Sequence, residues 1–344
     1  MYEIDFLPVG NGARSGDAVA IRFTRPDNGQ LAHVIIDGGF EDDGDALVAH
    51  VERYYKVEDI DLVVLTHPDG DHIGGLGSVI KELNVNALAA HDLAAHGGAE
   101  LAAAKATTEL IELAKSEGTA VYEPFEGLNA FSGALVIAGP SQPFFEQRVA
   151  EEVAREKAGT RTAAPKRVLR EALERLSARV LSAFPVETDF DDSGGTNPRN
   201  NSSAIVDIKL EEGRFLFTGD AGVPALEAAL DYLESQGRTE TPLKFAQVPH
   251  HGSRHNGSRA QIERMLGTPT EEERGSAFVS ISKAASEDPR YPSPRITNAY
   301  GRRGFKVGET AGNSICCPSS DAPDRGWSPL PIVPPRDESI DDRD

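Results

Sequence analysis

The chain has 344 residues and a formal net charge of −20, so it can bury a sizeable core in one large domain or two ordinary ones. This acidity argues against a broad basic surface for duplex nucleic acid, because phosphate binding depends on clustered Lys and Arg. No run of eighteen apolar residues exists and the N-terminus lacks a basic and then apolar leader, so we expect no membrane span and no signal peptide. The only two cysteines, Cys316 and Cys317, are adjacent and provide no disulfide framework, which favours the cytoplasm.

The first 140 residues alternate predicted strands and helices. Apolar and β-branched runs predict strands at 2–10, 18–24, 33–39 and 134–140. The run at 59–67 has the composition of a strand that is buried on both faces. Helical spacing occurs at 45–55, and further helices are expected at 75–83 and at 99–117.

The pattern changes between about 141 and 185, where amphipathic helices are expected. We interpret this segment as a helical insertion between two strand-rich halves, available for packing or for contact with a protein partner. Strands resume at 203–211, 213–220, 243–252 and 276–282, with a helix at 224–237. Residues 319–344 are acidic, rich in proline and without periodicity, so they are expected to form a flexible tail after a domain of residues 1–318.

The segment "VLTHPDGDHIGGL" at 64–76 carries the strongest chemical signal. It places His67, Asp69, Asp71 and His72 within six positions, directly after the expected buried strand. Neutral imidazoles and carboxylates form a mixed nitrogen and oxygen ligand set that suits Zn²⁺ or Mn²⁺. A cation would also neutralise carboxylates that otherwise repel one another. The glycine pair that follows lets the backbone pass close beside such a site.

Further residues of the same kind stand where other strands end. Asp37 ends one expected strand, Asp220 ends another, and His250 and His251 end a third. A single Asp after a strand is ordinarily a turn residue or a helix N-cap. Four strands that each end in a residue able to bind a metal predict one site assembled from distant parts of the chain.

Three motifs in this order, "THPDGDHIGG", "LFTGDAG" and "VPHHGSRHN", resemble the metallo-β-lactamase family. More narrowly, they are similar to the C-terminal hydrolase domain of the bacterial competence protein ComEC and its stand-alone relatives, as are "IIDGG" and "NNSSAIV". The opening "FLPVGNGARSGDAVAI" is similar to the start of that subgroup, although Pro8 stands where an Asp is usual and three extra residues precede Gly16 and Asp17. The resemblance covers about residues 1–310, interrupted by the insertion.

The resemblance implies an α/β fold, a four-layer αβ/βα sandwich with the metal site at one edge. His67 and Asp69 would serve one metal position, Asp71 and His72 mainly the other, and Asp220 would bridge them. One of the paired histidines would complete the set, and we favour His250 because it leaves its strand first. The implied ligands are His67, Asp69, Asp71, His72, Asp220 and His250 or His251, and the implied supporting residues are Asp37, Asp17, Asn200 and Asn201.

Two departures from the wider family refine this ligand set. Asp69 occupies a position where many members have a histidine, and Asn200 or Asn201 stands where another histidine is common. Both departures are shared with the competence-type subgroup. They shift the ligands toward oxygen, which makes Mn²⁺ a candidate beside Zn²⁺ and leaves open whether one or two ions are held.

The sequence therefore predicts a metal-dependent hydrolase, in the first place a phosphodiesterase or nuclease acting on single-stranded nucleic acid or a nucleotide. Metal-activated water needs no separate nucleophile, and Asp71 is the predicted residue that accepts or orients the proton of that water. Ser253, Arg254 and Arg199 flank the ligand loops and are candidates for substrate binding. An ester or lactone hydrolase of the same fold, or a metal-stabilised interaction module in a bacterial defence or uptake system, remains open as an alternative.

Overall fold

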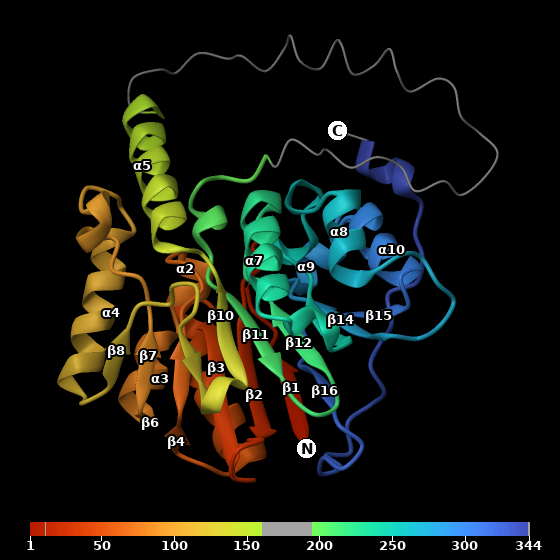
Figure 1. Ribbon diagram of the computed structural model, residues 1–344, viewed down its shortest axis with the longest axis horizontal. Coiled ribbons are helices and arrows are strands. Elements are labelled where there is room, and N and C mark those ends of the chain that lie inside the picture. The colour runs from red at the N-terminus through yellow and green to blue at the C-terminus, as the bar shows by residue number, and fades with distance from the viewer. Residues whose placement is uncertain (11, 160–194, 343–344) are drawn as a thin grey trace.

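The computed structural model describes residues 1–10, 12–159 and 195–342. These residues form two large sheets packed face to face, with helices on the outer face of each (Figure 1). The predicted four-layer α/β sandwich is thereby confirmed.

The first sheet has the strand order β16-β1-β2-β3-β5-β7-β8. Its strands are β1 (Tyr2–Phe6), β2 (Ala18–Thr24), β3 (Leu31–Gly38), β5 (Leu62–Val64), β7 (Ala87–Ala89), β8 (Ala120–Tyr122) and β16 (Ile315–Pro318). Helices α1 (Gly44–His50), α3 (Leu76–Glu82) and α4 (Ala104–Ser116) contribute to the apolar cluster on its outer face. A short parallel pair, β4 (Asp59–Ile60) and β6 (Asn84–Val85), lies beside it.

The second sheet has the order β15-β14-β13-β12-β11-β10-β9. Its strands are β9 (Asn129–Ala130), β10 (Leu135–Gly139), β11 (Ile205–Lys209), β12 (Arg214–Phe217), β13 (Leu243–Gln247), β14 (Gly275–Val279) and β15 (Phe305–Glu309). Helices α7 (Val223–Ser235), α8 (Arg259–Leu266) and α10 (Pro294–Arg302) pack on its outer face, and α9 (Lys283–Ser286) is short. No helix among the described residues has the length and apolar character that a membrane span requires.

Strand β2 shows why the sheets are buried on both sides. Val19, Ile21 and Phe23 join the core between the two sheets, whereas Ala18 and Ala20 face the helices. Successive side chains of a strand point to opposite faces, so a strand without polar alternation requires cover on both. The apolar runs in the sequence therefore predict strands that are covered on both faces, as the layered fold requires.

Helix α5 (Gln142–Gly159) is the described part of the predicted insertion, and residues 160–194 lie outside the described residues. Figure 1 shows α5 rising above the sheets, and this helix contacts Ala94–Gly98 and Asn200–Ser202, while α2 (Gly70–Ile73) is the short helix that carries the second half of the main motif. The boundaries of the insertion stay a prediction.

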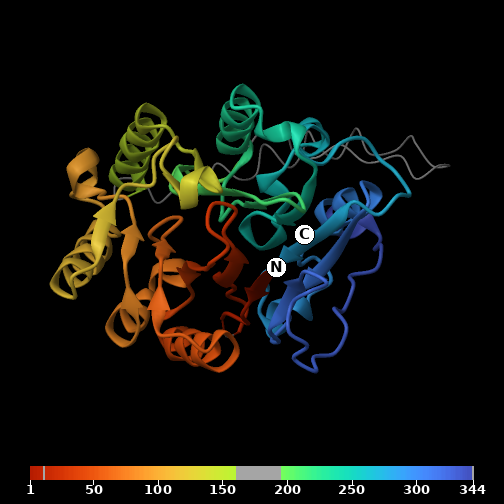
Figure 2. The same cartoon turned by 60° about the horizontal axis from the view of Figure 1, so that its bottom comes forward.

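The C-terminal segment lies against the sandwich where the sequence predicts a flexible tail. Arg325 forms ion pairs with Glu3 and Asp5, which are fully buried in β1. Further along, Ile332 pairs with Gly308 of β15, and Figure 2 shows the blue C-terminal part of the chain along one side of the sandwich. Neutralising two buried carboxylates gives residues 319–342 a reason to pack that the composition of the segment does not reveal. The division into a domain of residues 1–318 and a tail stays a prediction.

Candidate metal centre

The predicted ligands converge because parallel strands deliver them to one edge. Strands β3 and β5 run parallel in the first sheet, and β12 and β13 run parallel in the second. The loop after β5 carries His67 and Asp69, and α2 carries Asp71 and His72. The loops after β12 and β13 carry Asp220 and the histidine pair. Gly75 permits this approach, because a Cβ there would lie 2.1 Å from the carbonyl oxygen of Gly38.

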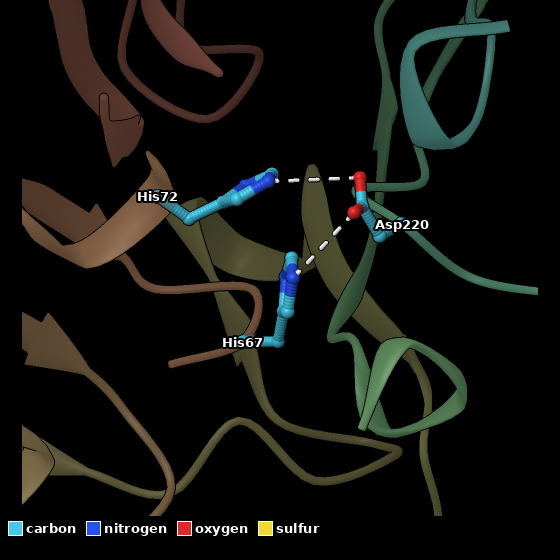
Figure 3. A group of neighbouring side chains, drawn as sticks. All are labelled: His67, His72 and Asp220. Carbon is cyan, nitrogen blue, oxygen red and sulfur yellow. Dashed lines mark ion pairs between the residues drawn. The ribbon is translucent and has the colours of Figure 1, made fainter. Parts of the chain in front are cut away.

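Asp220 lies at the centre of the group, with a pair of histidines on each side. Its Oδ2 is 3.6 Å from Nε2 of His67 and 3.5 Å from Nε2 of His250. Its Oδ1 is 3.6 Å from Nε2 of His72 and 3.7 Å from Nε2 of His251. Figure 3 shows His67 and His72 each pointing at one oxygen of this carboxylate. Asp71 lies within 4.8 Å of His72 and His251 and belongs to the Oδ1 side.

Three of the imidazoles are fixed in the same chemical state. Nδ1 of His67 contacts the hydroxyl of Thr66 at 3.1 Å, Nδ1 of His72 contacts Asp37 at 2.7 Å, and Nδ1 of His251 contacts the carbonyl of Ser280 at 3.1 Å. Asp37 and the Ser280 carbonyl can only accept, so those two Nδ1 atoms carry the hydrogen. Thr66 gives its own hydrogen to Asp37, so its oxygen accepts from His67 in turn. In each ring in its neutral form, the lone pair is therefore on Nε2.

These lone pairs have no hydrogen-bond partner within the described part of the chain. Nε2 of His67, His72 and His251 is buried and unpartnered, and so is Oδ1 of Asp220. Buried polar atoms ordinarily find a partner, so four that converge require one. Imidazole nitrogens with an engaged Nδ1 and a carboxylate oxygen are the donors that Zn²⁺ and Mn²⁺ take. The residues present fit a divalent cation.

Asp37 orients the ring of His72 through its contact with Nδ1. Its carboxylate accepts a hydrogen bond from the backbone amide of Thr66 at 2.7 Å and from the Thr66 hydroxyl at 2.6 Å, besides the contact with His72. A carboxylate behind a ligating histidine fixes the tautomer and raises the basicity of the ring. The structure thus places Asp37 where the sequence analysis expected a supporting residue.

Asp17 and Gln247 link the two sheets beneath the centre. Asp17 is buried, and its Oδ2 accepts from Nε2 of Gln247 at 2.9 Å. Oε1 of the same glutamine accepts from the backbone amides of Thr218 and Gly219, directly before Asp220. Gln247 therefore fixes the Asp220 loop relative to Asp17. Sequence reasoning missed it because a glutamine inside a strand carries no ligand signal.

The histidine pair has an unusual backbone. His250 and His251 have φ values of 48° and 54°, and Gly252 follows with 77°. Residues other than glycine rarely adopt this left-handed backbone conformation, and such strain persists mainly at functional sites. The two bent residues present successive rings to the two sides of Asp220, which an extended strand cannot do with neighbouring residues.

His250 and His251 differ in the hydrogen-bond partners of their rings and in their exposure to solvent. Nδ1 of His250 contacts Oδ1 of Asn256 at 2.8 Å, and its Nε2 lies 3.3 Å from Nδ2 of Asn200. The side chain of His250 is 33 % exposed, whereas that of His251 is 14 % exposed. The expected preference for His250 rested on chain order, but the geometry gives the unpartnered nitrogen to His251.

Asp69 and Arg199 form an ion pair beside His67. Oδ1 of Asp69 accepts from Nη1 of Arg199 at 2.7 Å, and Oδ2 lies 3.7 Å from Nε2 of His67. Burial acts to raise the pKa of Asp69, but its interactions with His67 and Arg199 outweigh burial and lower that pKa to about 2. Arg199, predicted to bind substrate, is thus already engaged by a predicted ligand.

The remaining predicted residues lie around the same loops. Ser253 caps the short helix that follows the histidine pair, and Arg254 donates to the backbone carbonyl of Asp341 in the C-terminal segment. Asn200 contacts His250, whereas Asn201 is buried and its Nδ2 lies 3.5 Å from the carbonyl of Asn197.

The charges of the site respond to one another. Burial acts to raise the pKa of Asp220, but the four surrounding histidines lower it. Burial acts to lower the pKa of His72, but Asp220 and Asp37 raise it well above its ordinary value. Burial also raises the pKa of Asp17. Shifts of pKa in opposite directions within one cluster are typical of functional centres, and the negative charge of this cluster suits a bound cation.

Comparison with known proteins supports this description of the fold. A family model described as the metallo-beta-lactamase superfamily matches residues 12–178. That range includes the main motif, whereas Asp220 and the histidine pair lie beyond it. No curated protein matches the chain.

Solved structures that are described as metallo-beta-lactamases or as members of that superfamily are similar to this chain at low sequence identity. Tm1679, a metal-dependent hydrolase of the beta-lactamase superfamily, is 13% identical over 93% of this chain and 100% of its own, with a TM-score of 0.45. The archaeal metallo-beta-lactamase superfamily protein ST1585 from Sulfolobus tokodaii is 14% identical over 70% of this chain and 78% of its own, with a TM-score of 0.32. A metallo-β-lactamase from Cronobacter sakazakii is 11% identical over 67% of this chain and 75% of its own, with a TM-score of 0.34.

Proposed function

We propose that this chain, which has the metallo-β-lactamase superfamily fold, is a metal-dependent hydrolase that cleaves phosphodiester bonds. The observation that carries the proposal is the convergence of three unpartnered Nε2 atoms, from His67, His72 and His251, on the Asp220 carboxylate. The substrate class we propose is single-stranded nucleic acid or a nucleotide.

Two cation positions are proposed, one on each side of Asp220. The Oδ1 side is formed by His72, His251 and Asp71, which lie within 4.8 Å of one another. The Oδ2 side is formed by His67, Asp69 and His250. The Oδ1 side has the more deeply buried donors, so we expect it to hold its ion more tightly.

A divalent cation supplies a lowered pKa for the attacking water and polarises the phosphoryl oxygens. The chain's own residues do the rest. Asp71 accepts or orients the proton of that water, because it is the ligand carboxylate most open to solvent on the Oδ1 side. Asn256 and Asn200 orient His250, and Asp37 orients His72.

The donor set favours phosphodiesters over esters and lactones. It contains more carboxylate than the histidine-rich centres of the wider family, which suits an ion that binds phosphate oxygens. The cysteines offer no competing nucleophile, since burial raises the pKa of Cys316 and raises that of Cys317 to about 11. The net charge of −20 argues for a small or flexible substrate. A competence-type relationship, a cytoplasmic location and a protein partner at the insertion belong to the same proposal.

The test begins with metal analysis of the purified protein. Turnover is then measured on bis-p-nitrophenyl phosphate, single-stranded DNA and a lactone, with Zn²⁺ or Mn²⁺ added. We expect phosphodiester turnover that falls by about 100-fold or more in Asp71→Asn, while Asp42→Asn, at an exposed carboxylate on the surface, changes nothing. Turnover of the lactone alone would replace the phosphodiesterase proposal with the lactonase alternative, and unchanged phosphodiester turnover in Asp71→Asn would refute the assigned role.

A further inference from the structure

Helix α5 buries a carboxylate where packing alone would take an apolar residue. Its inward face consists of Phe145, Val149 and Glu152, whose spacing of four and three residues places them on one side of the helix. Phe145 and Val149 pack into a small apolar cluster with Leu93 and its neighbours. Glu152 is only 1 % exposed. A buried carboxylate is costly unless it is paired, so the partners of Glu152 explain its presence.

Two arginines share this carboxylate. Arg155 donates Nε to Oε2 at 2.7 Å and Nη2 to Oε1 at 2.6 Å, from one turn further along the same helix. Arg199 donates Nη2 to Oε1 at 2.9 Å and Nη1 to Oδ1 of Asp69 at 2.7 Å. The planar guanidinium of Arg199 thus spans from the insertion to the metal centre, with one nitrogen on each carboxylate.

We infer that Glu152 and Arg199 are positioning residues that fix Asp69 as a ligand with one oxygen available. Arg199 occupies Oδ1 of Asp69, and Oδ2 remains directed to the side of Nε2 of His67, 3.7 Å away. Because Glu152 holds Nη2 of the guanidinium in place, Asp69 cannot rotate away without breaking its own ion pair with Arg199. The insertion, expected to serve packing or a partner, therefore acts on the metal centre. This inference rests on the proposed function only in requiring that a cation binds there.

Electrostatics and geometry act in the same direction at Glu152. With the glutamate present, the positive charge of Arg199 is divided between two carboxylates. Without it, Asp69 alone faces that charge, and the guanidinium competes with a cation for the ligand. Loss of Glu152 also frees the orientation of Asp69. Both effects weaken metal binding on the Oδ2 side.

The test measures Zn²⁺ binding to metal-free protein by calorimetry, without any activity assay. Glu152→Gln is compared with Glu151→Gln, a neighbouring exposed glutamate that pairs with Arg148. We expect Glu152→Gln to weaken the Oδ2-side ion by about 10-fold to 100-fold, the range typical of residues behind a ligand. Glu151→Gln binds as the wild type does. If Glu152→Gln does not fold, Arg199→Lys is measured in its place. Lysine keeps the charge but cannot bridge two carboxylates as the planar guanidinium does, so we expect the same weaker binding.

A double-mutant cycle separates positioning from a general structural effect. If Glu152 acts through Arg199, Glu152→Gln changes Zn²⁺ affinity by less than about twofold once Arg199→Gln is present. An equal effect in both backgrounds overturns the inference, and so does wild-type affinity in Glu152→Gln. A wild type that binds no Zn²⁺ or Mn²⁺ overturns this inference and the proposed function together, whereas bound metal with an inert Glu152 overturns this inference alone.

Discussion

Two buried clusters of charge in this protein are resolved in different ways. The tail cluster, formed by Glu3, Asp5, Arg22, His50 and Arg325, pairs each of its carboxylates with cations of the chain itself. In the candidate metal centre, carboxylates and imidazoles face one another with unpartnered atoms among the residues described. Burial is therefore no sign of function by itself. What distinguishes the candidate metal centre is that the Nε2 atoms of three imidazoles converge on one carboxylate, whereas in the tail cluster the carboxylates face arginine donors.

Asp5 and Asp17 express this difference in a single property. Both side chains are almost completely buried. Burial acts to raise the pKa of Asp5, but His50 and Arg325 outweigh it and lower that pKa. For Asp17 burial dominates and the pKa is raised, since the histidines near it are opposed by Asp220 and Asp37. The ionised form of Asp5 is stabilised by cations of the chain, whereas that of Asp17 is destabilised by burial and by nearby carboxylates.

The largest effect is expected from Asp220→Asn, which removes the charge shared by both sides of the metal centre. An amide cannot bridge cations as a carboxylate does, so bound metal and nearly all hydrolysis are lost. Enzymatic acceleration is typically about 10⁶-fold or more, and most of it should disappear. Metal content and turnover of the purified variant are the measurements. Full turnover in this variant would show that Asp220 belongs with the structural cluster.

The next effect is expected in the tail cluster, from Arg325→Met. This change leaves Glu3 and Asp5 buried with fewer partners, so the free energy of unfolding should fall by about 3–5 kcal/mol. Urea unfolding measures it, and zinc affinity should remain that of the wild type. Arg25→Met provides the control, because Arg25 pairs with Asp27 at the surface and its loss should change stability little. A stability equal to the wild type would show that the tail contact contributes nothing.

The smallest effect is expected at acid pH, in the difference in stability between the wild type and Arg325→Met. The folded pKa of Asp5 is lowered, so its contribution to stability is present above the unfolded value of about 3.9 and is lost as pH falls through the folded pKa. In Arg325→Met much of the stability that ionised Asp5 contributes is already lost at neutral pH. The gap in free energy of unfolding between the two proteins should therefore narrow below about pH 4. A gap that stays constant down to pH 2 would contradict the assignment to Asp5.

Much of the candidate site could be predicted from the sequence, because the strand-end motifs give both the residue types and their order along the chain. His67, His72 and Asp220 lie together as those motifs suggest. The residues behind them could not be predicted. Thr66 and Gln247 act by a hydroxyl and an amide aimed across the fold, and neither has a spacing that distinguishes it from an ordinary strand residue.

The histidine pair shows where sequence reasoning reached its limit. Order along the chain favoured His250, but ring direction depends on backbone angles that no residue pattern reveals. Two successive left-handed residues place one ring on each side of Asp220. Arg199 was similarly expected to meet substrate, and its contact with Glu152 arises from a helix nearly fifty positions away.

Local patterns determined most of the strands and helices and the kind of chemistry, since apolar periodicity and ligand-type residues are properties of short stretches, and the layered fold followed from the family resemblance of the motifs. The crowded "THPDGDHIGG" already indicated a cation. The tertiary structure decided which donors remain without a partner, which arginine holds Asp69 and which carboxylates the tail neutralises. Those outcomes depend on distances between residues far apart in the chain, and only the packed sheets set these distances.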